Sequence, residues 1–269
     1  MPVAHSNQPA KGFTLVELVI VIVLLGIVAT FTFRFVGIGA EMFAQGSERL
    51  QTLEQGRFAV ERLSRELKQA VPNSVRTITP GASALQCVEF TPTRAAGRYR
   101  RGPGGNTFTL ISFSQGWQTL GSDRAFIYAT QTPQIYSATA ERYVTLDAGQ
   151  SPDADFVTEL TYSGNIQGNS PQRRVYIGQT PVSYCLQGNQ LWRYANYGWL
   201  ATQPTPGNGL SGGVLMAERL NNSNSGALPF AVNAANLQRT STVTLYLEFV
   251  SNSTEPLFFN YAVNIANAP

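Results

Sequence analysis

The pattern of apolar and polar positions sets the amino-terminal part of the chain apart from the rest. Residues 1–12 are polar, and from Phe13 the sequence turns into the apolar run FTLVELVIVIVLLGIVATFTFRF, with no charge between Glu17 and Arg34. The uncharged residues 18–33 would form about 24 Å of helix, slightly less than the hydrocarbon core of a bilayer. Counted from Phe13, with Glu17 near the lipid headgroups, the helix is long enough to span a membrane once.

An amphipathic pattern follows this run. Leucine and valine recur at steps of mostly three and four residues, at Leu50, Leu53, Val60, Leu63, Leu67 and Val71. This spacing predicts a helix with one apolar face, and Pro72 is a suitable terminator. We therefore expect one helix over residues 13–71, whose first part (13–33) needs a membrane or other copies of itself and whose second part packs on a globular domain. The glycines between residues 37 and 46 predict a local unwinding or bend.

Beyond residue 72, short strand-like runs alternate with turns rich in Gly, Pro, Asn and Ser. The clearest runs begin at Leu85, Thr107, Phe156, Arg173, Thr242 and Leu257. Residues 182–195 predict a hairpin that turns at Gly188 and Asn189, and the last two runs predict another. The pattern predicts an α+β fold in which the long helix packs on an antiparallel sheet. Residues 72–269 form the β-rich globular domain, with long loops near 97–105 and 204–213.

Composition narrows the class of protein but names no partner. Of 269 residues, 43% are hydrophobic and 13% are charged. These values exclude a disordered polyelectrolyte and a membrane protein with many spans. The formal net charge of +3 is too small to indicate a nucleic-acid partner by itself.

The amino-terminal motif differs from an ordinary secretory signal, in which the cleavage site follows the apolar run. Here the small residue precedes the run, in Lys11-Gly12, and Glu17 lies within the apolar segment, where an unpaired carboxylate is costly. The residues KGFTLVE, from Lys11 to Glu17, resemble without a gap the class III signal of type IV pilins and pseudopilins. An ordinary signal anchor is the alternative, but it gives the Glu17 carboxylate no use.

This resemblance implies a type IV pilin-like fold and a processing pathway. Residues 1–12 would be a leader that prepilin peptidase removes by cutting between Gly12 and Phe13, after which the new amine of Phe13 is methylated. The Glu17 carboxylate would pair with the amine of a neighbouring subunit in the filament core, which compensates its burial. Lys11 fits a cytoplasmic leader, with a single inner-membrane helix and the globular domain in the periplasm and later in an extracellular pilus. The implied partners are prepilin peptidase, other major and minor pilins and the inner-membrane assembly platform.

The same cut makes an enzyme unlikely on chemical grounds. It would remove His5, the single histidine of the chain. A catalytic triad and a histidine-ligated metal are then excluded, and carboxylates are sparse beyond the helix. We therefore expect no catalytic residues, no cofactor and no metal site.

Cys87 and Cys185 lie in two separate strand-like runs, without a CxxC motif or a nearby histidine. This arrangement excludes a zinc site and a thioredoxin-type motif. In the oxidising periplasm we expect a Cys87–Cys185 disulfide, and two free buried thiols are the alternative.

Three further segments carry chemistry. The basic segment TRAAGRYRRGPGG holds four arginines beside Tyr99: Arg94, Arg98, Arg100 and Arg101. It has the chemistry to contact DNA phosphates or an acidic neighbouring subunit, although a solvated or internally paired loop is the commoner case, so nucleic acid is not the expected partner. Asp153 and Asp155 lack the spacing of a calcium loop. The aromatic residues of segment 190–199 suit core packing better than carbohydrate binding.

Phrases in the globular part carry a closer resemblance. GRFAVERLSREL, VEFTPTRAAGRYR, PVSYCLQGNQLWRY and YAVNIANAP resemble minor pilins of mannose-sensitive haemagglutinin (MSHA) pili, and the first phrase also resembles PilW-like pilins. The resemblance implies a low-copy subunit that initiates or caps the filament, and the chain is larger than a usual major pilin. A type II secretion pseudopilin and a pilus-tip adhesin or DNA-binding subunit are the alternatives.

Overall fold

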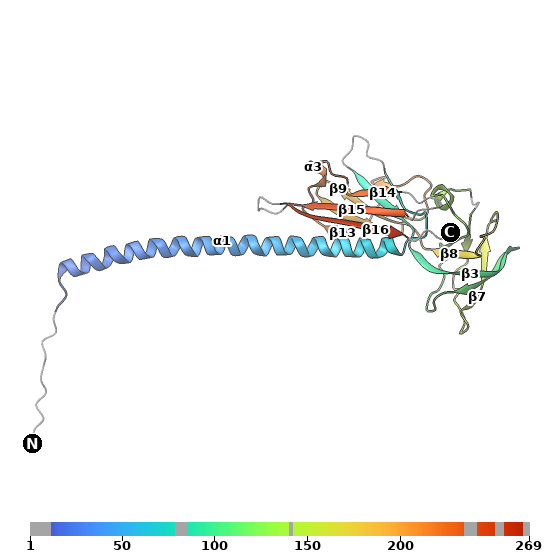
Figure 1. The fold of residues 1–269 in the computed structure, drawn as a ribbon, viewed down its shortest axis with the longest axis horizontal. Coiled ribbons are helices and arrows are strands. Elements are labelled where there is room, and N and C mark those ends of the chain that lie inside the picture. Colours follow the sequence, from blue (N-terminus) through green and yellow to red (C-terminus); the bar gives the residue numbers. More distant parts are fainter. Residues whose placement is uncertain (1–11, 79–84, 140–141, 234–240, 251–255, 266–269) are drawn as a thin grey trace, which may run out of the picture. The chain divides into compact units, whose positions relative to one another are not determined.

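The computed structural model describes residues 12–78, 85–139, 142–233, 241–250 and 256–265. The chain divides into two compact units, residues 1–50 and 51–269. The described helices are α1 (Leu15–Lys68), α2 (Pro133–Tyr136) and α3 (Asn222–Ser225). The described strands are β1 (Arg76–Thr77), β2 (Gln86–Phe90), β3 (Thr93–Gly104), β4 (Thr107–Ser112), β5 (Arg124–Phe126), β6 (Tyr143–Leu146), β7 (Val157–Ser163), β8 (Arg174–Gly178), β9 (Val182–Gln187), β10 (Gln190–Tyr194), β11 (Thr205–Pro206), β12 (Gly209–Leu210), β13 (Val214–Ala217), β14 (Phe230–Asn233), β15 (Ser241–Phe249) and β16 (Leu257–Ile265). Figure 1 shows these elements, and the predicted α+β architecture with a long amino-terminal helix is confirmed.

Helix α1 is 54 residues long and is helical throughout, which corresponds to about 81 Å. The predicted unwinding at the glycines between residues 37 and 46 is wrong, since all of these residues are helical. A glycine costs a helix only about 1 kcal/mol and removes no backbone hydrogen bond, so isolated glycines leave a long helix intact. The helix ends at Lys68, three residues before the predicted end, and Val71 already donates its N–H to the carbonyl of Thr91.

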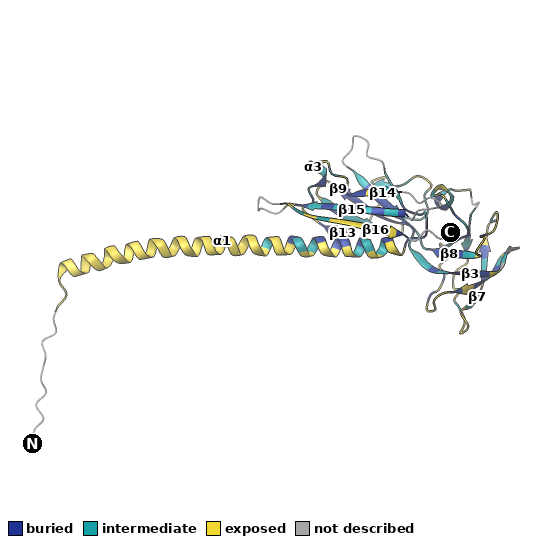
Figure 2. Cartoon of the chain, in the orientation of Figure 1, coloured by how far each residue is buried: buried dark blue, intermediate teal, exposed yellow. Residues whose placement is uncertain are grey.

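In the unit formed by residues 1–50, the described residues 12–50 present almost only exposed side chains. Between Leu15 and Leu50 every residue except Glu48 is exposed, as the yellow colour in Figure 2 shows. The side chains of Phe31, Phe33 and Phe35 are 70%, 78% and 79% exposed. This unit therefore has an uncovered apolar surface on all sides of the helix.

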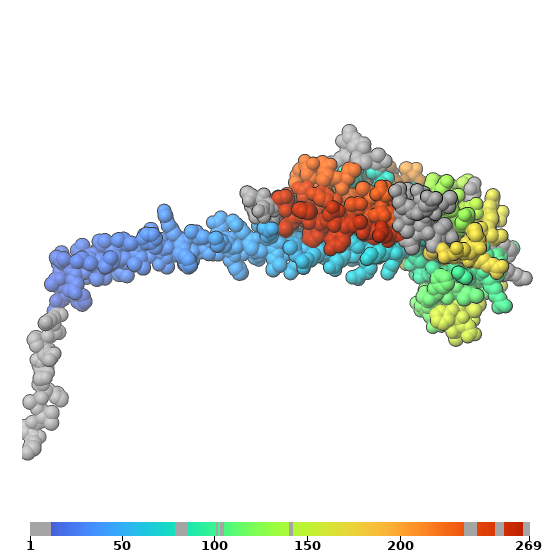
Figure 3. Space-filling model, viewed as in Figure 1, coloured from blue at the N-terminus to red at the C-terminus, as the bar shows by residue number. Residues whose placement is uncertain are grey.

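The part of α1 within residues 51–269 is one-sided. Its buried residues are Thr52, Gly56, Ala59, Val60, Leu63 and Leu67. The prediction that Leu50 lies on the buried face is wrong, because its side chain is 58% exposed. A small residue allows the close approach of α1 to strand β16, because a Cβ atom on Gly56 would lie only 2.8 Å from Cζ of Phe259. Figure 3 shows strands β15 and β16, in orange and red, seated directly against the cyan part of α1.

Two antiparallel sheets cover this part of the helix. One has the order β1-β2-β9-β10-β13 and the other has the order β14-β15-β16. Both predicted hairpins are confirmed: Gln187 pairs with Gln190 across the turn at Gly188, and β15 pairs with β16 over its whole length. Gly188 has φ +59°, a conformation that glycine adopts without strain. The two inner sheet faces and the helix enclose the main core.

The strands between β2 and β9 form a structure that the sequence pattern did not predict. They close into a six-stranded barrel of order β3-β4-β7-β6-β5-β8, with its own apolar core. The predicted loop at residues 97–105 is wrong, because residues 93–104 form strand β3 and pair with β4 and β8. Register shifts at Tyr99 and Arg101 accommodate the glycine- and arginine-rich sequence within the strand. Residues 204–213 contain only the short strands β11 and β12.

Candidate processing and assembly site

The predicted cleavage site lies immediately before α1. Gly12 and Phe13 are non-helical and exposed, and Phe13 is 80% exposed. A Cβ atom on Gly12 would meet no described atom within 4 Å. The peptide bond between the two residues is therefore open to an enzyme, while residues 1–11 of the expected leader, Lys11 among them, lie outside the described residues.

Thr14 and Glu17 together start the helix. The side-chain oxygen of Thr14 accepts a hydrogen bond from the backbone N–H of Glu17 at 3.3 Å, and its carbonyl accepts the first helical bond from Leu18. Threonine at the N-cap with glutamate three residues later is a capping-box sequence, and the carboxylate lies in the first turn, where the helix dipole favours negative charge. We did not predict this local role, although the T-x-x-E spacing is a signal for it.

The Glu17 carboxylate is exposed and makes no ion pair within the described part of the chain. It is the one acidic residue among the apolar residues that precede Arg34. An ionised carboxylate in an apolar environment is costly, and a positive group beside it offsets this cost. The arrangement fits a cation supplied from outside this chain, such as an amine at the terminus of another helix.

The hydroxyls within the apolar segment are satisfied by the helix itself. Thr30 donates to the carbonyl of Gly26 and Thr32 donates to that of Val28, each at 2.8 Å. Such bonds remove the cost of placing a hydroxyl in an apolar medium. Helix α1 is long and apolar enough to cross a membrane by length and composition, and its apolar window lies near the amino terminus.

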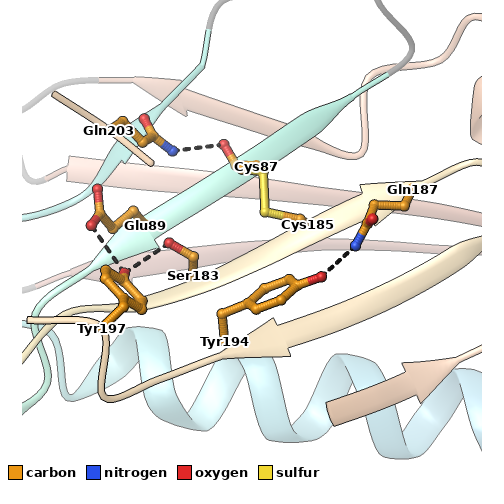
Figure 4. The surroundings of a disulfide bond; sticks show 8 residues. All are labelled: Cys87, Glu89, Ser183, Cys185, Gln187, Tyr194, Tyr197 and Gln203. Carbon is orange, nitrogen blue, oxygen red and sulfur yellow. Dashed lines mark hydrogen bonds between the residues drawn. A yellow bond between two sulfur atoms is a disulfide. The ribbon is translucent and has the colours of Figure 1, made fainter. Parts of the chain in front are cut away.

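The predicted disulfide is present. Cys87 in β2 and Cys185 in β9 are direct partners in the antiparallel ladder, with their Cα atoms 4.1 Å apart, and their sulfur atoms are bonded. Figure 4 shows the surroundings of this bond, where the hydroxyl of Tyr197 lies between Ser183 and Glu89. Both cysteines are buried, so the bond ties two central strands at their core.

The four arginines of the basic segment do not form one site. Arg94 is bound internally: its Nε lies 2.5 Å from Oδ2 of Asp123, which is fully buried, and its Nη2 lies 3.2 Å from Oδ1. This residue therefore belongs to the structure of the barrel. Arg98 and Arg100 are exposed on strand β3, and the side chain of Arg101 lies outside the described residues.

The aromatic side chains of segment 190–199 pack against other residues of the globular part. Tyr194 is buried, and Trp192, Tyr197 and Trp199 are half-buried. Trp199 contacts the rings of Phe126 and Tyr136 and the Arg124 guanidinium. Burial lowers the pKa of Arg124 to about 10, against the opposing effect of Tyr143. This packing offers no exposed aromatic platform for a sugar.

The acidic residues of the loop before β7 have a local use. The Asp153 carboxylate accepts hydrogen bonds from the N–H groups of Asp155 and Val157. Within the described residues no group of three or more His, Cys, Asp or Glu side chains is arranged to hold a metal ion.

Comparison with known proteins identifies the amino-terminal segment. Residues 7–33 match the family model of the prokaryotic N-terminal methylation motif. No curated protein matches the chain, and no solved structure matches it. The motif, the apolar helix that carries it and the disulfide support a type IV pilin-like or pseudopilin protein that is processed by prepilin peptidase and assembles with other pilins.

Proposed function

We propose that this chain is a minor pilin of a type IV pilus, incorporated at low copy to initiate the filament or to cap its tip. The observation that carries the proposal is the methylation motif at residues 7–33, in register with an uncovered apolar helix. Cleavage between Gly12 and Phe13 frees the amine of Phe13, four residues before Glu17, and this amine is methylated in a separate step. The uncovered helix then moves from the inner membrane into a bundle of similar helices, where its apolar surface is buried again.

The Glu17 carboxylate sets the axial position of the subunit in this bundle. A charge buried among apolar helices is costly when it is unpaired, so the register in which Glu17 meets a neighbour's amine is favoured over other registers. The carboxylate thus selects one register of assembly.

The particular pilus that we propose is of the MSHA type, with this chain in the role of the minor pilin MshO. The phrases of the globular part, from GRFAVERLSREL to YAVNIANAP, and the length of the chain support this assignment. A pseudopilin of a type II secretion system shares the amino-terminal chemistry and is the second candidate.

Quantitative mass spectrometry of sheared surface filaments and of inner membranes from the same cells tests the function. We expect the N-methylated Phe13 peptide in both fractions, with only a trace of this protein relative to the major pilin in the filaments. Processed protein that stays entirely at the membrane would favour the secretion pseudopilin.

A substitution tests the role of the carboxylate. Glu17→Gln is expected to lower incorporation into filaments by about tenfold or more, because each 1.4 kcal/mol lost from an ion pair is a factor of ten. Glu41→Gln, in the same exposed part of α1, is the matched control and should assemble normally. Equal incorporation of both variants would contradict the pairing role.

A further inference from the structure

Strand β3 separates its side chains into a buried row and an exposed row. Ala95 and Tyr99 point into the barrel, and Gly97 between them is buried as well, while the alternating Arg98 and Arg100 are exposed on its outside. Strand β8 runs beside β3 (Figure 1), and its Val175 and Ile177 are buried in the same core. Arg174 therefore lies on the outer side of β8.

The two strands bring like charges face to face. Arg98 is the direct partner of Arg174 in the antiparallel ladder, so both side chains leave the same face at neighbouring positions. Like charges directly opposite each other destabilise a sheet. The ion pairs recorded for the described residues involve other arginines (Arg62, Arg76, Arg94 and Arg193), so neither Arg98 nor Arg174 is neutralised within the described chain.

Exposed apolar side chains lie beside this pair. Ile111 in β4 is the partner of Arg98 on its other side, and its side chain is 42% exposed. Phe113, two residues further, is 65% exposed, and its N–H donates to the carbonyl of Ala96 in β3 at 2.8 Å. We use the term arginine face for Arg98, Arg100, Arg174, Ile111 and Phe113.

We propose that the arginine face binds a protein partner whose surface carries clustered carboxylates beside an apolar side chain. A carboxylate between Arg98 and Arg174 accepts hydrogen bonds from both guanidinium groups and removes their repulsion, and arginine suits such forked pairing. Ile111 and Phe113 supply the apolar contact next to it, the combination that protein interfaces use at their centres.

The charges around the face favour a protein over a nucleic acid. Beyond Ile111, strand β7 carries the exposed Glu159 opposite Thr109 of β4, and Asp155 precedes the same strand. A phosphate backbone continuing across the barrel would meet these carboxylates, whereas a compact acidic patch would not. The inference needs only the folded barrel, so it stands independently of the pilin role.

Site-specific photo-crosslinking in the native cell tests the proposal with the full chain. A photoreactive phenylalanine analogue replaces Phe113, which leaves both arginines in place, and the same analogue at the exposed Ser163 of β7 is the control. We expect an adduct from position 113 alone, attached to a protein segment that holds two or more Asp or Glu residues near an apolar residue. Arg174→Glu should reduce this adduct by about tenfold, while Arg57→Glu, an equal charge change on α1, should not. Exchanging the partner's carboxylates for arginine should then restore the adduct with Arg174→Glu.

Three results would overturn the proposal. They are an adduct no stronger at position 113 than at Ser163, an adduct with a segment that lacks clustered acids, and an adduct that nuclease removes. Misfolding of Arg174→Glu is tested by its thermal unfolding midpoint in detergent. This midpoint should be unchanged or raised, because the substitution relieves the repulsion with Arg98.

Discussion

Two arginines four residues apart on strand β3 have different physical roles. The Arg94 guanidinium neutralises the buried Asp123 carboxylate, which also accepts a hydrogen bond from the N–H of Leu120. Arg98 is exposed on the outer face of the same strand. The sequence predicted a basic segment but could not distinguish the roles of Arg94 and Arg98, because only the closed barrel brings Asp123 next to Arg94.

The first prediction compares these two residues. Arg94→Met leaves a buried carboxylate without its cation and is expected to lower the free energy of unfolding by about 3–5 kcal/mol. Arg98→Met, on the same strand, should change it little. Urea unfolding of the full chain in detergent micelles measures both. A loss of the same size in each variant would contradict the structural role of Arg94.

A second buried carboxylate, Glu89, is held between Arg76 and Tyr197. Burial raises its pKa above the ordinary value, although hydrogen bonds from Arg76 and Tyr197 oppose this effect. An acid whose folded pKa is raised retains its proton in the folded state over a pH range where the unfolded chain has lost it. Its contribution to stability is therefore present at low pH and is lost as the pH rises from about 4.5 through the folded pKa.

The second prediction follows from this sign. The free energy of unfolding of the native chain, measured relative to Glu89→Gln, is expected to fall as the pH rises through that range. Unfolding in urea at a series of pH values gives the difference directly, and the glutamine variant removes the titration while keeping the size of the side chain. A difference that grows with pH would mean that Arg76 and Tyr197 outweigh burial.

At the scale of elements, local signals predicted the hairpins and failed at the barrel. The Gly188-Asn189 turn and the alternation of β15 and β16 are carried by neighbouring residues, so the sequence alone predicts them. Strand β3 instead contains Gly97, Gly102 and Gly104, which are typical of loops. Strand β3 forms because it pairs with β4 and β8, and β8 lies about 75 residues away in sequence. Only the tertiary structure brings this partner strand to β3.

The third prediction concerns the bond between β2 and β9. The disulfide joins residues 98 positions apart, and closing a loop of this length is worth about 4.7 kcal/mol in the chain-entropy model. Replacing both cysteines by alanine is expected to lower the free energy of unfolding by about 2–5 kcal/mol. Guanidinium unfolding of the native chain with and without a reductant provides the control, since the reductant should act on the native chain only.

At the scale of the whole molecule, the two compact units differ in what covers their apolar residues. The described part of residues 51–269 encloses apolar cores between the helix and the sheets and inside the barrel. Residues 12–50 leave their apolar side chains exposed, including Phe43 at 79% exposure. Apolar surface of this extent requires lipid, detergent or other helices.

The fourth prediction separates the units. Residues 51–269, which retain the packed part of α1, are expected to be monomeric in aqueous buffer. Residues 13–269 should form large particles unless detergent is present. Size-exclusion chromatography with light scattering measures both, and a monomeric 13–269 chain in plain buffer would contradict the expectation.

The two chain connections between the barrel and the sheet lie side by side. Gln179 donates its N–H to the carbonyl of Pro92 at 2.9 Å, and Thr93 is the partner of Gly178, so the first and last residues of the barrel are neighbours. Strands β2 and β9 pair next to this connection, and the Cys87–Cys185 disulfide joins them covalently. Because the barrel is attached in this way, evolution can lengthen, shorten or exchange it while the pairing of β2 with β9 stays the same. The surface of the barrel can thus change in sequence and in length without altering the scaffold that holds it.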